Sequence, residues 1–112
     1  MYFYDFNSMP DELMAPKYST AFGPLLTGEQ IEVGLLRFKA DEGAVPHAHP
    51  HEQIMVVLSG KLRVRFGEET ADLGPGQAFL APPNVEHQVT ALEDSAVLSC
   101  KNLIEGIAHR LG

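Results

Sequence analysis

The chain has 112 residues, of which 45% are hydrophobic and 21% are charged, and its formal net charge at pH 7 is -7. This length and composition predict one soluble globular domain, residues 1–112, with a single hydrophobic core. The negative charge argues against nucleic acid or an anionic membrane as a partner.

The chain contains a single cysteine, Cys100, which excludes an intramolecular disulfide. Because this residue ends the apolar run 96–100, we expect a thiol packed in the core rather than a nucleophile. No apolar run approaches the roughly 20 residues of a transmembrane helix, and the N-terminus lacks a signal pattern. We therefore expect a cytoplasmic protein.

Residues 1–26 predict an arm that precedes the main body of the domain. Tyr2, Phe3 and Tyr4 are strand-prone aromatic residues, and residues 8–13 predict a helix cap followed by one helical turn. An aromatic terminus is costly to leave in water, so we expect it to pack on the domain or on a second copy of the chain. A homodimer is therefore favoured.

The rest of the chain predicts short strands separated by turns. Residues 18–26 predict a strand interrupted at Gly23-Pro24, and residues 54–58 suit a strand buried on both faces. The basic side chains of residues 61–66 indicate the solvated face of a strand. The tail, residues 102–112, has weak helical or irregular character. The other predicted strands are 31–40, 61–66, 70–73, 77–81, 87–91 and 96–101.

About eight or nine short strands with almost no helix are typical of a β-sandwich or barrel. The fold class predicted from the pattern alone is therefore all-β. Several apolar residues at alternating positions are candidates to line a barrel, and packing in the core is favoured for most of them. These residues are Met55, Val57, Leu62, Val64, Phe66, Phe79 and Val89.

Residues 47–53, His-Ala-His-Pro-His-Glu-Gln, hold three of the five histidines of the chain. In an extended strand alternate side chains share a face, so His47, His49 and Gln53 are predicted to project together. A fourth imidazole, His87, follows a stretch rich in glycine and proline that bends the chain. Such donors could enclose a divalent cation, and without one they would be costly to desolvate. Metal binding is favoured over a metal-free polar pocket.

Two segments together resemble the paired motifs of the cupin superfamily. Residues 43–60 begin Gly-Ala-Val-Pro-His-Ala-His-Pro-His-Glu-Gln, and residues 76–87 read Gly-Gln-Ala-Phe-Leu-Ala-Pro-Pro-Asn-Val-Glu-His. The resemblance implies a single cupin domain, a double-stranded β-helix or jelly-roll barrel that is frequently dimeric. It also implies one divalent transition metal per chain, which is zinc, nickel, iron, manganese or copper. The ligands implied by the resemblance are His47, His49, Gln53 and His87.

The sequence departs from the common cupin pattern at three positions. Gln53 stands where glutamate is usual, Asn84 replaces a glycine, and the asparagine expected after the last histidine is Ala91. Asparagine tolerates the left-handed backbone, so Asn84 changes little. The neutral Gln53 leaves the site one positive charge richer, which favours Lewis-acid chemistry on an oxygen atom. An iron oxygenase with two histidines and a carboxylate is less favoured, although cupin dioxygenases with three histidines exist as a group.

Four further residues near the motifs have expected roles. His51 is expected behind the ligands or at the rim of the pocket, because Pro50 distorts the strand there. Met55 and Phe79 are candidates for contact with substrate, with core packing as the alternative. His109, in the tail, is expected to be exposed to solvent.

The two motifs are similar to those of small KdgF-like cupins of pectin and alginate breakdown, which linearise 4,5-unsaturated uronates. This resemblance implies a small-molecule substrate and a metal-dependent isomerase or lyase that opens a sugar ring. Where those enzymes place an acidic residue, an aromatic residue and an arginine, this chain has Ser99, Lys101 and the tail. Lys101 and Tyr18 stay open as the acid or base. The alternatives are a metal-dependent cupin dioxygenase and a non-catalytic sugar-binding or sensing cupin.

Overall fold

Two antiparallel sheets form the protein. In the computed structural model, which describes residues 2–111, the chain has one 3-10 helix, η1 (Phe6–Ser8), and eleven strands. The predicted all-β jelly-roll fold is confirmed. The predicted bounds at residues 1 and 112 fall on the two residues outside this description. The strands are β1 (Glu12–Leu13), β2 (Phe22–Gly23), β3 (Leu25–Thr27), β4 (Ile31–Phe38), β5 (Gly43–His47), β6 (Gln53–Ser59), β7 (Leu62–Phe66), β8 (Glu69–Leu73), β9 (Ala78–Ala81), β10 (His87–Ala91) and β11 (Ser95–Asn102).

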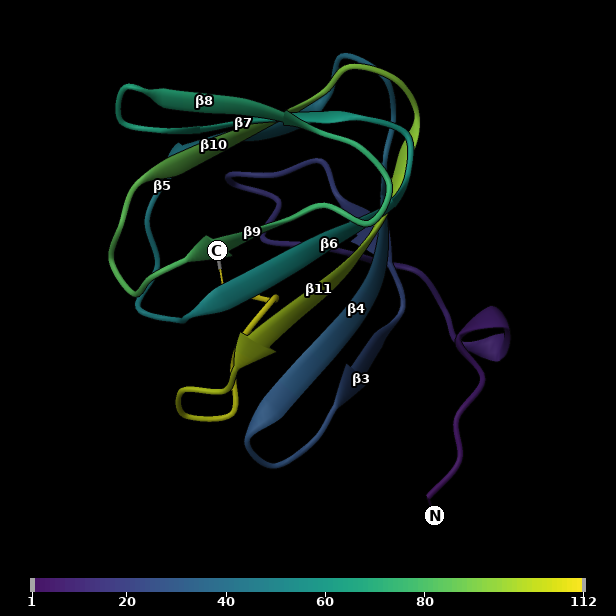
Figure 1. Cartoon of the computed structure of the whole chain (residues 1–112). Helices are drawn as coiled ribbons and strands as arrows, with labels where there is room; N and C mark the ends of the chain where they lie inside the picture. Colours follow the sequence, from purple (N-terminus) through teal and green to yellow (C-terminus); the bar gives the residue numbers. More distant parts are fainter. Residues whose placement is uncertain (1, 112) are drawn as a thin grey trace.

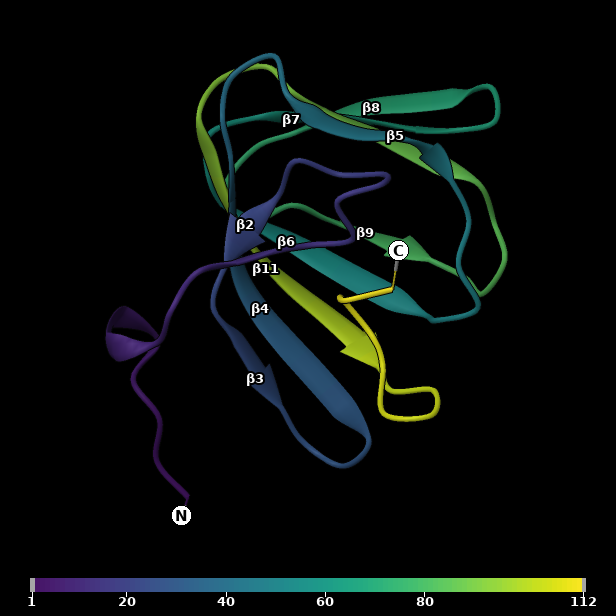
Figure 2. The same cartoon turned by 180° about the vertical axis from the view of Figure 1, so that it is seen from behind.

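The sheets face each other as the two walls of a barrel (Figures 1 and 2). Across residues 2–111, the larger sheet has seven strands in the order β1-β2-β4-β11-β6-β9, with β3 also paired to β4, and the smaller has four in the order β5-β10-β7-β8. A Cβ at Gly43 would collide with the backbone oxygen of Val89, so glycine lets β5 lie close to β10. No helix within the described range is long and apolar enough to cross a membrane.

Alternation along the strands builds the core between the walls. On β4, Leu36 and Phe38 are buried, whereas Ile31, Val33 and Leu35 face outward, because successive side chains of a strand point to opposite faces. All seven residues predicted to line the barrel belong to this core or, in the case of Phe66, pack against it. The predicted strands 61–66 and 70–73 are confirmed as β7 and β8, which pair with each other as an antiparallel hairpin.

The N-terminal arm differs from its prediction in the place of its helical turn. The helical turn lies at Phe6–Ser8 rather than within residues 8–13, because the Asp5 carboxylate accepts hydrogen bonds from the Asn7 backbone N–H at 2.9 Å and the Ser8 hydroxyl at 3.0 Å. The aromatic side chains of Tyr2 and Phe3 are 90% and 87% exposed, so they do not pack on the body of the domain.

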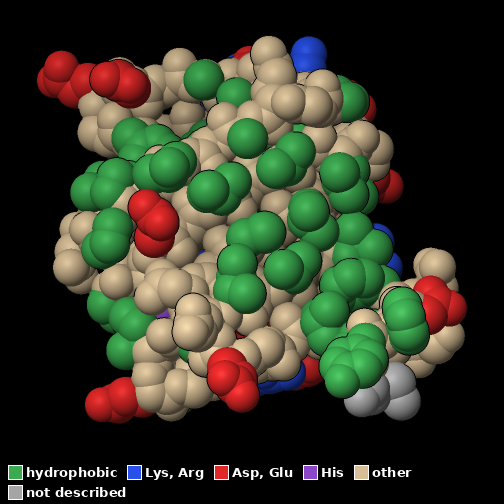
Figure 3. All heavy atoms as spheres, turned by 60° about the horizontal axis from the view of Figure 1, so that its bottom comes forward, with side chains coloured by type: hydrophobic (Ala, Val, Ile, Leu, Met, Phe, Trp, Pro, Cys, Tyr) green, Lys and Arg blue, Asp and Glu red, His purple; other side chains and the backbone are tan. Residues whose placement is uncertain are grey.

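The outer face of the larger sheet is apolar (Figure 3). The run 54–58 is buried on its inner face only, so the prediction of a strand buried on both faces is wrong: Ile54 and Leu58 are exposed. The expectation of a core thiol is also wrong, since Cys100 is half-buried on this outer face while Ser99 and Lys101 point inward. The apolar outer face comprises Ile31, Val33, Leu35, Ile54, Val56, Leu58, Leu80, Leu98 and Cys100.

The C-terminal segment, residues 103–111, is irregular, as predicted, and folds back beside the ends of β6 and β11 (Figures 1 and 2). The expectation that His109 is exposed to solvent is wrong: its side chain is 2% exposed. The imidazole is held inside by hydrogen bonds to Ser99 and Glu32, two polar residues on inward-facing positions of the larger sheet.

Candidate metal centre

The histidine-rich stretch 47–53 is not one continuous strand, because a loop lies between its two ends. β5 ends at His47 and β6 begins at Gln53, and the residues between them cross from the smaller sheet to the larger. The prediction that strand alternation places His47, His49 and Gln53 on one face is therefore wrong. Pro50 has no N–H to donate to a ladder, and the loop around it replaces the continuous strand.

His87 reaches the same place from the second motif. It begins β10 and lies opposite His47 in the antiparallel register, with ring centroids 4.6 Å apart. Asn84 has the left-handed backbone predicted for it, with φ of 64°. Its N–H donates to the backbone oxygen of His49 at 2.7 Å, which ties the second motif to the histidine loop.

The three imidazoles converge. One ring nitrogen from each of His47, His49 and His87 lies within 4.8 Å of the other two. The Gln53 side-chain oxygen lies 3.2 Å from Nε2 of His49. His49, Gln53 and His87 are buried, and His47 is half-buried. The fold therefore brings together the four donors that the sequence singled out.

Backbone carbonyls fix how the rings face. The Nδ1 atoms of His47 and His87 donate to the oxygens of residues 45 and 85, at 2.7 and 2.9 Å, and Nδ1 of His49 lies 3.0 Å from the oxygen of His51. A carbonyl oxygen only accepts, so each Nδ1 carries a proton, and a ring that binds a metal carries no second one. The Nε2 atoms then keep lone pairs, the arrangement in which imidazole binds a metal.

The donor set fits a divalent transition metal. Burial lowers the pKa of His49 to about 4, helped by repulsion from Lys101, and burial also lowers the pKa of His87. At neutral pH the His49 ring is therefore neutral, and its Nε2 lone pair and the Gln53 oxygen, 3.2 Å apart, are both acceptors. A cation between them removes that repulsion. Imidazole and carbonyl ligands suit zinc, nickel, copper, iron or manganese.

A cleft of about 220 Å³ opens beside the histidines, and Tyr18, His47, His49 and Lys101 line it. Lys101, on β11 opposite Gln53, is only 8% exposed, and burial lowers its pKa to about 8 although Glu32 opposes this. Within residues 2–111 no atom accepts a hydrogen bond from its ammonium. The ring of Tyr18 stacks on His47 at 5.7 Å between centroids.

The remaining predicted site residues lie deeper. Met55 and Phe79 are buried in the core cluster and border a cavity of about 40 Å³ that also touches the metal-facing residues. His51 lies outside the three-histidine group, with its ring 5.9 Å from His49. Its Nε2 donates to the backbone oxygen of Ile107 at 2.7 Å, so it contacts the C-terminal segment.

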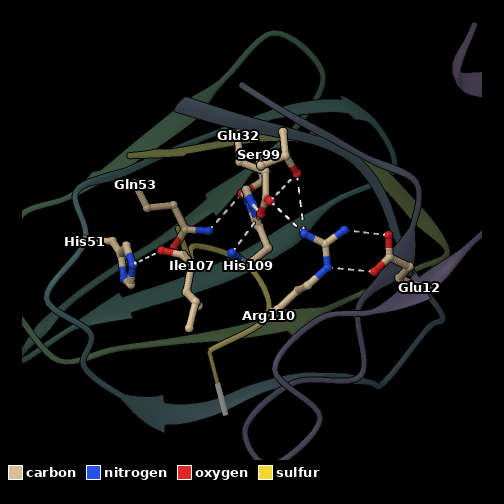
Figure 4. Close-up of polar contacts among 9 residues, drawn as sticks. Glu12, Glu32, His51, Gln53, Ser99, Ile107, His109 and Arg110 are labelled. Atoms are coloured by element: carbon tan, nitrogen blue, oxygen red, sulfur yellow. Dashed lines mark hydrogen bonds and ion pairs between the residues drawn. The ribbon is translucent and has the colours of Figure 1, made fainter. Parts of the chain in front are cut away.

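Sequence reasoning missed three buried polar residues behind Gln53: Glu32, Ser99 and His109 (Figure 4). One signal was available for Glu32. It shares a face of β4 with Leu36 and Phe38, so alternation places a carboxylate on the inner wall. The contact with His109 joins residues 77 positions apart, which no local pattern encodes.

Comparison with known proteins agrees with this fold. Residues 34–100 match the Cupin domain family. An RmlC-like cupin from Shewanella frigidimarina is 18% identical, with a TM-score of 0.80 over 91% of this chain and 90% of that chain. KdgF from Halomonas sp. is 26% identical, with a TM-score of 0.78 over 89% and 93%. The polyketide cyclase RemF from Streptomyces resistomycificus is 18% identical, with a TM-score of 0.74 over 91% and 79%. Curated protein sequences give no significant match.

Proposed function

The chain belongs to the cupin domain family, and from that premise we propose that it is a metal-dependent enzyme acting on a small, oxygen-rich acid. The reaction we propose is the isomerisation or ring opening of a sugar acid. The likeness to KdgF, at 26% identity over 89% of the chain, supports this class. The motifs of the chain resemble those of KdgF-like cupins, which linearise unsaturated uronates.

The observation that carries the proposal is the lysine cation that lines the cleft beside the converging donors. Imidazoles bind a metal in their neutral form, and the Gln53 amide is neutral, so nothing in the donor set offsets the charge of a divalent metal. Lys101 adds a second positive charge, is 8% exposed, and has no acceptor among residues 2–111. Its ammonium nitrogen is nevertheless open to solvent, and Lys101 lines the cleft, so a bound carboxylate would pair with it there. The site therefore suits an anionic substrate.

Ring opening of a cyclic hemiacetal needs a proton to leave the hydroxyl group and one to reach the ring oxygen as the ring C–O bond breaks. It needs no oxidant. A divalent metal held by His47, His49, Gln53 and His87 would supply Lewis-acid polarisation of a substrate oxygen. Lys101, with its pKa lowered to about 8, is charged at pH 7 yet gives up a proton readily, so we assign the proton transfer to it.

Tyr18 and the histidine loop give this cleft its walls. The Tyr18 ring stacks on His47 and is 42% exposed, so it stands at the rim, where its hydroxyl can hydrogen-bond a sugar. Met55 and Phe79 border the smaller cavity of about 40 Å³, which shares His47 and Lys101 with the cleft.

The test is turnover of a 4,5-unsaturated uronate by zinc-, nickel- or manganese-loaded protein under anaerobic conditions, followed by NMR. We expect turnover that Lys101→Met reduces about 100-fold or more with metal content intact. Lys61→Met, which removes an exposed lysine, is the matched control. Activity that requires oxygen would indicate the dioxygenase alternative. Tight binding without conversion across uronates would indicate the binding or sensing alternative.

We also propose that the chain forms a homodimer through the apolar outer face of the larger sheet. Ile31, Ile54 and Leu80 are 54%, 42% and 51% exposed there. Their neighbours on the same strands are also apolar, so the patch is continuous across the sheet (Figure 3). A second copy of the same face would cover it.

A further inference from the structure

A chain of hydrogen bonds runs from the metal centre to the C-terminal segment (Figure 4). The Gln53 amide nitrogen donates to the Ser99 hydroxyl at 2.9 Å, and that hydroxyl lies 2.8 Å from Nε2 of His109. Nδ1 of His109 lies 2.7 Å from a carboxylate oxygen of Glu32. The four side chains are between 0% and 6% exposed, so water does not compete for these contacts.

The carboxylate of Glu32 fixes which atom is the donor in each of these hydrogen bonds. The Glu32 carboxylate also accepts from the Thr27 hydroxyl at 2.6 Å and from the Arg110 guanidinium at 3.0 Å. Burial alone would raise the pKa of Glu32, but the hydrogen bonds from His109 and Thr27 lower it to about 2, so it is ionised. A carboxylate only accepts, so Nδ1 of His109 must carry a proton and donate it.

The remaining protons follow in order. Burial lowers the pKa of His109, so at neutral pH the ring carries one proton, on Nδ1, and Nε2 accepts from the Ser99 hydroxyl. That hydroxyl donates its only proton to His109, so its oxygen can only accept a hydrogen bond from the Gln53 amide. The amide is therefore turned with its NH₂ group toward Ser99 and its oxygen toward His49, on the metal-binding side.

The Ser99, His109 and Glu32 arrangement has the connectivity of a nucleophilic triad, but its surroundings exclude that role. Ser99 is 0% exposed and borders neither the cleft of about 220 Å³ nor the cavity of about 40 Å³. A substrate carbonyl cannot reach its hydroxyl. The group acts through Gln53 instead.

We propose that Ser99, His109 and Glu32 are positioning residues that hold the Gln53 amide oxygen on the metal, and that this relay selects an amide over a carboxylate at position 53. The proposal rests on the metal centre of the proposed function, not on its substrate. The proposal gives the C-terminal segment a role in the site. The segment supplies Arg110 and also His109, which lies 56 residues after Gln53 in the sequence.

The relay gives a reason for the departure from glutamate. A carboxylate at position 53 has no N–H to give to Ser99, so the single hydroxyl proton would face two acceptors, the new carboxylate and Nε2 of His109. One of them would be left buried without a donor, which is costly. We therefore expect Gln53→Glu to tighten the binding of hard cations only once the relay is removed.

The direct test compares Ser99→Ala, His109→Ala and the double variant, with Cys100→Ala as the matched control on the outward face of the same strand. Zinc affinity is measured by chelator competition, and ¹⁵N NMR of the metal-free protein follows the Gln53 side-chain amide. We expect each single variant to weaken zinc binding about 10-fold to 100-fold and the double variant no more than the larger single, because the relay acts as one unit. Cys100→Ala should match wild type.

Other results would overturn the relay. Wild-type zinc affinity in folded Ser99→Ala protein would do so, as would additive losses in the double variant or a Gln53 amide resonance that Ser99→Ala leaves unshifted. Restored affinity in Ser99→Thr, which keeps the hydroxyl, would support it. A wild-type protein that takes up no zinc overturns the relay and the metal centre together. Normal zinc binding without uronate turnover contradicts only the proposed reaction.

Discussion

The three imidazoles of the metal centre are each oriented by a backbone oxygen two residues away, whereas the Gln53 amide is oriented by side chains from β4, β11 and the C-terminal segment. The first arrangement is local, so the histidine loop carries its own orientation. The second depends on the assembled fold, because Glu32 and His109 meet only when the segment has docked. We call the three histidines the self-contained side of the centre. Gln53, with the residues that orient it, is the dependent side.

Removing a ligand from the self-contained side should have the largest effect. His87→Ala deletes one of three converging nitrogens, so zinc affinity should fall by more than the roughly 100-fold limit for residues behind the ligands. Elemental analysis after gel filtration measures the loss. Gln88→Ala, next along β10 and on its opposite face, should retain zinc. Equal zinc retention by both variants would contradict the assignment of His87.

Lowering the pH should decrease the free energy of unfolding of the metal-free protein, because His49, on the self-contained side, takes up a proton when the chain unfolds. The pKa of His49 is about 4 in the folded state and about 6.5 when unfolded, so between these values the unfolded chain binds more protons. Stability is complete above pH 6.5 and falls as the pH drops toward 4, by about 3 kcal/mol from this group. Urea unfolding at pH 7 and pH 4 measures it. His49→Gln should lose less stability over that interval, and an equal loss would contradict the assignment.

The dependent side should be sensitive to its carboxylate. Glu32→Gln removes the negative charge and one of the two acceptor oxygens that hold His109 and Arg110. We expect a loss of about 2–3 kcal/mol in the free energy of unfolding, since hydrogen bonds to charged groups are strong. Asp72→Asn, which breaks the pair between Asp72 and Arg63, should cost much less, because both side chains are exposed to solvent. Equal costs would show that the buried network adds no stability.

The outer face should affect assembly and leave both sides of the centre unchanged. Leu80→Lys places a charge on the apolar outer face, so light scattering should report a monomer where wild type is a dimer. Thr70→Lys, exposed on β8 of the smaller sheet, should leave the dimer intact. A monomeric wild type would contradict the dimer proposal. Zinc affinity should be the same in all three proteins.

The self-contained side is also the side whose residues the sequence predicts. The histidines predicted from the two motifs converge in the structure, and Asn84 has the expected left-handed backbone. The expected mechanism of convergence was nevertheless wrong, because Pro50 lies in a loop and not a strand. The position of His109 was wrong as well, since its burial depends on a docked segment and a distant carboxylate. Strand alternation predicts which face a residue occupies, but not which distant side chain meets it there.

Zinc X-ray absorption spectroscopy of the loaded wild-type protein tests the metal centre most directly. The account predicts three imidazole nitrogens and an oxygen at about 2.0–2.2 Å, from His47, His49, His87 and Gln53. Gln53→Ala should remove the ordered protein oxygen and keep the imidazole scattering. A zinc ion with sulfur at about 2.3 Å, or one lost on gel filtration, would contradict the assignment of these four residues as its ligands.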